Sequence, residues 1–293
     1  MRKSAVGIVL VAVSFTASGC AGSNQGSSGT TAPAASSASA SASASESGSA
    51  FGSASVSAPP ALSVWSYDGA TGPEHWGDIA PGCATTPEST ESPIDIEKGS
   101  LVPDSGTDVT LNYTPATFEV ENNGRTIEAV PTDLEQNSII IDGTTYYLQQ
   151  FHFHTKSEHR INGATSPMEM HLVHKSDAGQ IAVVGVLLDS GTASEPLAEL
   201  FASIPPAENS SAPVELHHEI DVSKLVPSDP TLAQYDGSLT TPPCTEGVRW
   251  NVFLAPSTLS AEQIAAYTAV YDDTSRPVQP LNGRTVAQGS AGS

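Results

Sequence analysis

The chain has 293 residues, with 11 Lys and Arg against 32 Asp and Glu, and a formal net charge of −21. This acidity argues against nucleic acid or an anionic membrane surface as a partner, because both carry negative charge themselves. The length alone allows one large domain or two small ones, so the composition along the chain decides between them.

The first 19 residues resemble a secretory signal peptide. Arg2 and Lys3 precede an apolar run from Ala5 to Phe15, which is the order of regions found in such signals. The run is shorter than the about 20 apolar residues that span a bilayer, which disfavours a retained membrane helix. We therefore expect residues 1–19 to be a signal peptide and the chain to be exported. Without Arg2 and Lys3 the formal charge is −23, from 9 basic and 32 acidic residues.

Cys20 ends a stretch that resembles the box of a bacterial lipoprotein, Ala-Ser-Gly-Cys at residues 17–20. In such a box the cysteine is acylated and becomes the new N-terminus. The usual leucine of the first position is here Ala17, so simple secretion remains the alternative. We expect lipidation of Cys20, which would place the protein on the extracytoplasmic side of the cell membrane and would be its one link to that membrane.

Residues 20–62 are almost entirely Ser, Ala and Gly with scattered Pro. Such a segment cannot bury enough apolar surface to offset the entropy of ordering, so it predicts a disordered tether. The remainder fits one sheet-rich domain at residues 63–287, followed by a flexible tail at 288–293.

The chain has three cysteines, and if Cys20 carries lipid, Cys83 and Cys244 are the two that remain free to pair. In an oxidising compartment these two are expected to form a disulfide. Two free thiols or a cysteine-based metal site remain alternatives, although the isolated spacing, with no CxxC, favours the disulfide.

Short strand-like runs recur between Gly, Pro and Asn or Asp breaks, and helical signals are few. Ser260 precedes Glu-Gln, with Ile264, Tyr267 and Val270 at helical spacing. The composition and pattern predict a mainly β domain with a few peripheral helices. The expected strands are 109–113, 117–120, 126–130, 138–141, 144–153, 169–174, 181–188 and 248–254, and the expected helices are 196–202 and 260–270.

Two histidines lie on one face of an expected strand. Because residues two apart on a strand share a face, His152 and His154 lie on the same side as Gln150, opposite Phe151 and Phe153. A single buried histidine is commonly a hydrogen-bonded core residue, and we interpret His75, His159 and His174 as core or surface positions. Two imidazoles on one face of an apolar strand are costly to bury without a shared purpose.

The later strand repeats the arrangement, with Glu169 and His171 on one face and Met168, Met170 and Leu172 on the other. Each candidate ligand is thus preceded, two residues earlier, by a hydrogen-bonding side chain, and a metal-bound imidazole needs such a partner. Three neutral histidines with an open fourth position are typical of a catalytic zinc site.

Six segments together resemble the α class of carbonic anhydrases, of the exported bacterial type. The resemblance covers residues 63–287 in family order. The segments are "GPEHWGDI" (72–79), "SPIDI" (92–96), "QFHFH" with "SEH" (150–154, 157–159), "MEMHLVH" (168–174), "YDGSLTTPPCTEGVRW" (235–250) and "RPVQPLNGR" (276–284).

The resemblance implies one domain built around a large, mostly antiparallel twisted sheet, with zinc at the base of a cone-shaped cleft. The implied ligands are His152, His154 and His171. The implied reaction is reversible hydration of CO2 to bicarbonate and a proton, by attack of zinc-bound hydroxide. Cys83 and Cys244 also stand where exported bacterial members place their disulfide.

The resemblance also assigns roles around the zinc. Thr240 matches the residue that accepts a hydrogen bond from the hydroxide, with Thr241 beside it, and Glu158 matches the carboxylate that holds Thr240. Gln150 and Glu169 match the partners of the zinc histidines. The implied CO2 wall consists of Val173, Val183, Leu239 and Trp250, and Tyr67 and Asn123 match residues that order the cleft water.

Some positions depart from the family pattern. Arg125 stands at the position of the histidine proton shuttle, and arginine cannot accept and release a proton as histidine does. Glu91 replaces a usual Gln, and Glu128 a common polar amide; neutral drift at the cleft rim, with Arg125 and Glu128 paired, is one interpretation. The other is that proton export relies on external buffer or on another group. At Thr274 the family has Asn, but only the main-chain carbonyl is used there.

Two alternatives to an active zinc enzyme are a non-catalytic binding domain at the cell surface and a zinc store. Binding domains of this kind have generally lost a zinc histidine, whereas all three remain here. A zinc store would need neither Thr240 nor Glu158. The expected partner is the small-molecule pair CO2 and bicarbonate, with no nucleic acid, and the oligomeric state is left open, a dimer included.

Overall fold

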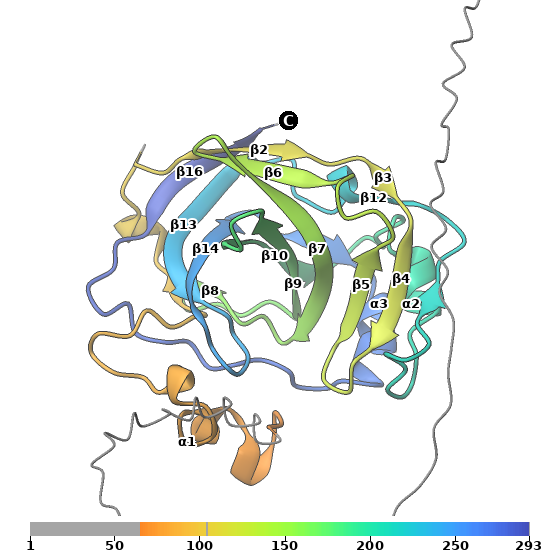
Figure 1. Cartoon of the computed structure of the whole chain (residues 1–293), viewed down its shortest axis with the longest axis horizontal. Helices are drawn as coiled ribbons and strands as arrows, with labels where there is room; N and C mark the ends of the chain where they lie inside the picture. Colours follow the sequence, from red (N-terminus) through yellow and green to blue (C-terminus); the bar gives the residue numbers. More distant parts are fainter. Residues whose placement is uncertain (1–64, 104, 293) are drawn as a thin grey trace, which may run out of the picture. The chain divides into compact units, whose positions relative to one another are not determined.

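A large twisted β-sheet dominates the described part of the chain, residues 65–103 and 105–292 of the computed structural model (Figure 1). The predicted signal peptide, Cys20 and the predicted tether lie outside the described residues. Within the described ranges, no helix is both long and apolar enough to cross a bilayer.

Most neighbours in this twelve-stranded sheet are antiparallel; the parallel pairs are β10 with β14, β10 with β15, and β16 with β2. Strand β7 pairs with β6 at one end of a series of strands that runs to β10, and β9 pairs with both β10 and β7. The paired strands therefore close into a ring, which Figure 1 shows from one end. The strands are β2 (Asp108–Asn112), β4 (Phe118–Asn122), β5 (Ile127–Pro131), β6 (Ser138–Ile141), β7 (Thr144–Thr155), β9 (Met168–Ser176), β10 (Ile181–Ser190), β11 (Val214–Glu215), β13 (Thr231–Ser238), β14 (Glu246–Phe253), β15 (Ser257–Leu259) and β16 (Ala287–Gly292).

Short elements complete the domain. Two small ladders pair β1 (Asp95–Ile96) with β8 (Arg160–Ile161) and β3 (Pro115–Ala116) with β12 (Ile220–Asp221). The helices are α1 (Trp76–Ile79), α2 (Ala198–Ala202) and α3 (Ala261–Thr268), and single 3₁₀ turns lie at Gly69–Thr71, Pro73–His75, Pro81–Cys83, Lys98–Ser100 and Val222–Lys224. The predicted mainly β fold around a mostly antiparallel twisted sheet is confirmed.

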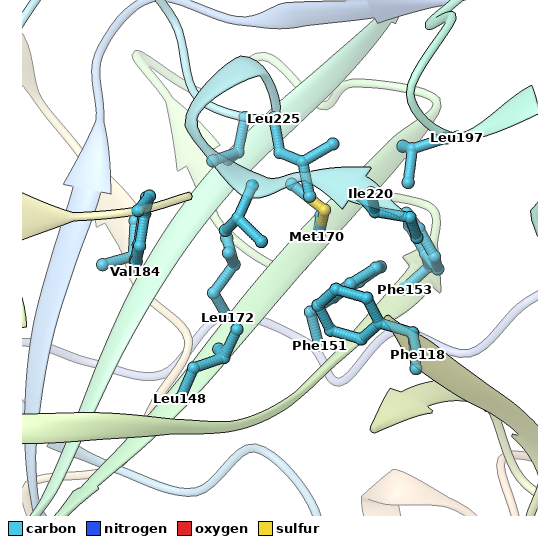
Figure 2. Packing of buried hydrophobic residues seen from close by; sticks show 14 of the residues in the cluster. Phe118, Leu148, Phe151, Phe153, Met170, Leu172, Val184, Leu197, Ile220 and Leu225 are labelled. Carbon is cyan, nitrogen blue, oxygen red and sulfur yellow. The ribbon is translucent and has the colours of Figure 1, made fainter. Parts of the chain in front are cut away.

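The predicted alternation on β7 and β9 is also confirmed. Phe151, Phe153, Met170 and Leu172 are fully buried in the main hydrophobic core, which Figure 2 shows from close by. This packing holds one face of each strand against the core. The opposite face of both strands is therefore fixed in position, and it carries the histidines.

Most predicted elements differ from the observed ones by one or two residues at their ends. Helix α3 begins where expected, because the Ser260 side chain accepts from Gln263 N and the Gln263 side chain accepts from Ser260 N. This capping box satisfies backbone donors that the first turn leaves open. The helix ends at Thr268, two residues earlier than predicted.

The prediction of a flexible tail at 288–293 is wrong for the residues described there. Ala287–Gly292 forms β16, which pairs with β13 on one side and β2 on the other. Its small residues have low strand propensity, but a Cβ at Gly289 would lie 2.2 Å from Gln234 Oε1. Close packing against β13 therefore selects glycine here, and two neighbouring strands supply the order that propensity does not.

The disulfide between Cys83 and Cys244 is present, so the prediction of a structural pair is confirmed and free thiols are excluded. It ties the turn at Pro81–Cys83 to the loop between β13 and β14, the loop that carries Thr240. A Cβ at Gly82 would lie 2.5 Å from Pro243 O, so the two segments approach as closely as glycine allows. The covalent link thus holds this loop against the N-terminal part of the domain.

Candidate metal centre

Strand register brings the three predicted histidines together. His152 on β7 lies directly opposite His171 on β9, and His154 lies opposite Glu169. A register shift between Leu148 and Gln150 sets this alignment. One ring nitrogen from each histidine lies within 4.8 Å of the others, and the Nε2 atoms of His152 and His154 are 3.1 Å apart.

The other ring nitrogen of each histidine is held by an oxygen. His152 Nδ1 lies 2.8 Å from Gln150 Oε1, and His171 Nε2 lies 2.9 Å from Glu169 Oε1. His154 Nδ1 lies 2.7 Å from the main-chain oxygen of Thr274, which explains why the departure from Asn at this position is tolerated. These oxygens only accept hydrogen bonds, so each of these nitrogens carries the proton.

Three lone pairs consequently face one another: Nε2 of His152, Nε2 of His154 and Nδ1 of His171. Converging acceptors without a proton between them repel, and a cation relieves this. The donor set therefore fits a metal ion. Three imidazole nitrogens are also the ligand set that zinc takes in catalytic sites with an open fourth position.

Burial keeps these histidines neutral at physiological pH. It lowers the pKa of His152 well below its usual value, that of His154 to about 4, and that of His171 as well, where Glu169 opposes the effect. A metal ligand must be the unprotonated imidazole. The site is thus prepared for a cation before one arrives.

A second cluster, His159 with Glu169 and His171, has the spacing of a metal site but is a hydrogen-bond network. His159 Nδ1 lies 2.7 Å from Glu169 Oε1, and His159 Nε2 lies 2.6 Å from the hydroxyl of Tyr235. Both ring nitrogens are used, so no lone pair remains for an ion. Of the two predicted alternatives for His159, a core or a surface position, the structure shows the core position. His159 holds the carboxylate of Glu169, which in turn holds His171.

Glu158 lies against the metal site with one oxygen unpaired. The residue is 1% exposed; Oε1 accepts from the backbone N–H of Arg276 at 2.8 Å, whereas Oε2 has no hydrogen-bond partner among the described residues. Oε2 lies 3.5 Å from His154 Nε2 and 3.9 Å from His171 Nδ1. Burial raises the pKa of Glu158 to about 7, and neighbouring His171 and Thr240 lower it in part. Thr240 is therefore close to Glu158, although no hydrogen bond of ordinary geometry reaches Oε2.

Arg276 positions Glu158, a role that the sequence did not reveal. Its guanidinium makes a buried ion pair with Glu91, 2.6 Å from Nη1 to Oε2, and donates to the main-chain oxygens of Ser92 and Cys83. Glu91 is thus a buried partner of Arg276 rather than a residue of the cleft rim. The segment "RPVQPLNGR" contributed to the family resemblance, but it did not predict the ion pair between Arg276 and Glu91.

The predicted apolar wall is formed by neighbouring strands. Val173 on β9 pairs with Val183 on β10, and Val183 pairs with Trp250 on β14. These side chains and the histidines line a cleft of about 300 Å³. Apart from Glu91, the structure brings the predicted cleft residues into it: Tyr67, Asn123, Arg125, Glu128, Gln150, His152, His154, His171, Val173, Val183, Leu239, Thr240, Thr241 and Trp250. Glu158 and Glu169 lie directly behind the histidines.

Trp65 and Ile181 also line the cleft and were not predicted. Ile181 has the same parity as Val183 on one strand, so alternation could have found it. Trp65 precedes every motif of the sequence, and no signal pointed to it.

The interpretation that Arg125 pairs with Glu128 is wrong. Among the described residues no ion pair joins them; the guanidinium carbon of Arg125 lies 4.4 Å from the ring centroid of Trp65. Glu128 instead accepts from Asn123 Nδ2 at 2.8 Å. Burial, followed by the charge of Glu121, raises the pKa of Glu128 to about 7.

This fold and site define a class of protein: a β domain with three anchored histidines at the base of an apolar-walled cleft. The family model of eukaryotic-type carbonic anhydrases matches residues 71–290. A carbonic anhydrase of Klebsiella pneumoniae is 41% identical over 231 residues, 77% of this chain and 91% of that protein.

Solved structures agree. The α-carbonic anhydrase of Photobacterium profundum is 41% identical, with a TM-score of 0.70 over 76% of this chain and 100% of that one. The Thermovibrio ammonificans enzyme, in complex with the inhibitor sulfanilamide, is 40% identical, with a TM-score of 0.70 over 76% and 98%. The chain belongs to the α-carbonic anhydrase family, and it is an enzyme of that family.

Proposed function

We propose that this chain catalyses the zinc-dependent, reversible hydration of CO2 to bicarbonate and a proton. The observation that carries the proposal is the convergence of three neutral, anchored imidazoles at the base of a cleft with one apolar wall. The retention of all three histidines together with Glu158 and Thr240 favours this enzyme over a binding domain or a zinc store.

The proposed zinc ligands are His152 and His154 through Nε2 and His171 through Nδ1. Zinc in such a site supplies Lewis acidity that lowers the pKa of a coordinated water to about 7, a value for which carbonic anhydrase is itself the reference case. Gln150, Glu169 and the Thr274 carbonyl fix the three rings, which line the cleft and would hold the ion there.

The remaining roles follow from placement. Val173, Val183, Leu239 and Trp250 offer CO2, which is apolar, a surface from which water is excluded. Thr240 accepts a hydrogen bond from the attacking oxygen, and Glu158 orients the Thr240 hydroxyl, as its unpaired Oε2 allows. The backbone N–H of Thr240, with Thr241 beside it, would face the bicarbonate anion, and Tyr67 and Asn123, which line the same cleft, would order its water.

Proton release is the step in which this chain departs from its family. Arg125 keeps its charge at neutral pH and cannot relay a proton. Protons therefore leave through a buffer molecule that enters the cleft. Turnover that rises with imidazole concentration supports this route, and turnover that does not depend on buffer contradicts it.

Stopped-flow measurement of CO2 hydration by the purified, zinc-loaded full chain tests the proposal. The expected result is a catalysed rate that zinc removal abolishes. His218→Ala is the matched control for any histidine variant, since His218 is exposed and bonded to Glu199 on the surface. Zinc-loaded chain without hydration at any buffer concentration would favour the binding-domain alternative.

We further propose that the chain is exported and anchored by a lipid on Cys20. The signal-like residues 1–19 and the Ala-Ser-Gly-Cys box support this. Metabolic labelling with a radioactive fatty acid should mark the wild-type chain and not Cys20→Ser. Equal release of both chains into the medium would instead support simple secretion.

A further inference from the structure

Arg125 is a cation at the cleft mouth without a carboxylate partner. None of the ion pairs among the described residues includes it. Its Nε is buried and has no hydrogen-bond partner in the part of the chain that the structure describes. The guanidinium lies over Trp65, 4.4 Å from the ring centroid, and an aromatic face holds it without using its N–H donors.

The groups around Arg125 offer further donors to the cleft. Burial raises the pKa of Tyr67 well above its usual value, and although Arg125 lowers it in part, the hydroxyl keeps its proton and remains a donor. Glu128 is the opposing charge in the same cleft, but its carboxylate is engaged by Asn123. The mouth thus presents a fixed positive charge to any molecule that enters the cleft.

We propose that Arg125 forms a subsite for a small anionic base, which serves as the proton acceptor of the reaction. The inference rests on the proposed CO2 hydration and specifies its second substrate by class: an oxyanion such as hydrogen phosphate rather than a neutral amine. In the net step, the water that adds to CO2 loses one proton, which passes through cleft water and forms an O–H bond with an oxygen of HPO4²⁻, so that CO2, H2O and HPO4²⁻ give HCO3⁻ and H2PO4⁻. The resulting H2PO4⁻ then leaves with the proton.

The charge of the acceptor decides the preference. A guanidinium binds oxyanions through charge-assisted hydrogen bonds, often two in parallel, and gains nothing comparable from neutral imidazole. Glu128 and the acidic surface oppose anions, so the binding should be weak. Weak binding suits a carrier that must leave in every turnover. An ion pair between the Arg125 guanidinium and an oxyanion at a solvent-facing site corresponds to about a fivefold effect on affinity.

The test compares hydration by the zinc-loaded full chain in phosphate and in imidazole, two buffers of similar pKa, at constant ionic strength. For each buffer, the concentration that gives half of the maximal rate is measured. The variants are Arg125→Gln and Arg125→Lys, and the control is Lys175→Gln, which removes one positive charge from an exposed position on β9.

The expected result is that Arg125→Gln raises the half-saturating concentration of phosphate about fivefold relative to that of imidazole. Arg125→Lys should retain part of the preference, and Lys175→Gln all of it. An unchanged ratio of the two concentrations in Arg125→Gln would overturn the subsite while CO2 hydration itself stands. Absence of hydration in both buffers would overturn the proposed function together with the subsite.

Discussion

The base and the mouth of the cleft are built in opposite ways. At the base, each histidine is fixed twice, once by strand register and once by an oxygen on its outer nitrogen. At the mouth, Arg125 is held by one aromatic contact and Glu128 by one hydrogen bond. A side chain fixed by several contacts cannot be substituted without moving its neighbours. A side chain at the mouth, with one contact, can be substituted with little effect on the residues around it.

This difference agrees with two of the departures from the family pattern, Arg125 and Glu128, which line the cleft; Thr274 departs at the base but acts there through its main-chain oxygen. The base retains every residue that the proposed chemistry requires. At the mouth, Arg125 stands at the position that the resemblance gives to the shuttle histidine, and Glu128 adds a carboxyl group. Substitutions should therefore have their largest effects at the base and progressively smaller effects toward the mouth.

His154→Ala should cause the largest loss. Loss of an outer hydrogen-bond partner typically weakens metal binding about 10- to 100-fold, and loss of a ligand itself should exceed that. Zinc content after dialysis and the CO2 hydration rate should fall together, with His218→Ala unaffected. Full zinc content in His154→Ala would show that this ring is not a ligand.

Thr240→Ala should keep its zinc and lose hydration rate. The variant removes the group that orients the attacking oxygen, and misplacement or loss of such a contact costs about 10²-fold in rate. Metal analysis and stopped-flow kinetics separate the two effects. An unchanged rate in Thr240→Ala would show that the Thr240 hydroxyl has no role in the chemistry.

Glu128→Gln should stabilise the protein at alkaline pH. The folded-state pKa of Glu128, about 7, lies above its usual value because of burial. The folded state favours the neutral carboxyl group of Glu128. The stability that this neutral group allows is therefore complete below the usual pKa of a glutamate and is lost as the pH rises through about 7. The variant should gain up to about 3 kcal/mol at pH ~8 and little at pH ~5.

Urea unfolding of wild type and Glu128→Gln at both pH values measures this. Glu135→Gln, at an exposed carboxylate on the surface, is the control and should change neither value. A gain of equal size at both pH values would attribute the effect to packing rather than to ionisation.

Arg125→His should have the smallest effect, confined to proton release. A histidine at this position can accept and release a proton near neutral pH, so the rate at low buffer should rise about tenfold. The rate at saturating buffer should change little. Unaltered dependence on imidazole concentration would mean that position 125 does not control the proton route.

The sequence predicted those parts of the molecule in which local pattern and tertiary packing agree. Strands β7 and β9 alternate apolar and polar residues over many positions, so their core face and their histidine face could both be assigned. Strand β16 could not, because Ala, Gly and Ser carry little strand preference and its order comes from β13 and β2.

Long-range contacts account for what the sequence did not reveal at the site. The alignment of His152 with His171 depends on a register shift in β7. The ion pair of Arg276 with Glu91 joins residues that lie 185 positions apart in the sequence. The resemblance to a known family supplied the ligand set. It did not reveal that the backbone N–H of Arg276 holds Glu158, or that Trp65 packs against Arg125.

Zinc titration of the metal-free full chain tests the central claim most directly. The hydration rate should rise in proportion to added zinc and level off at one zinc ion per chain, because the three histidine nitrogens form a single site. Hydration by the metal-free chain, or a rate that stays at zero with one zinc bound per chain, would contradict the account.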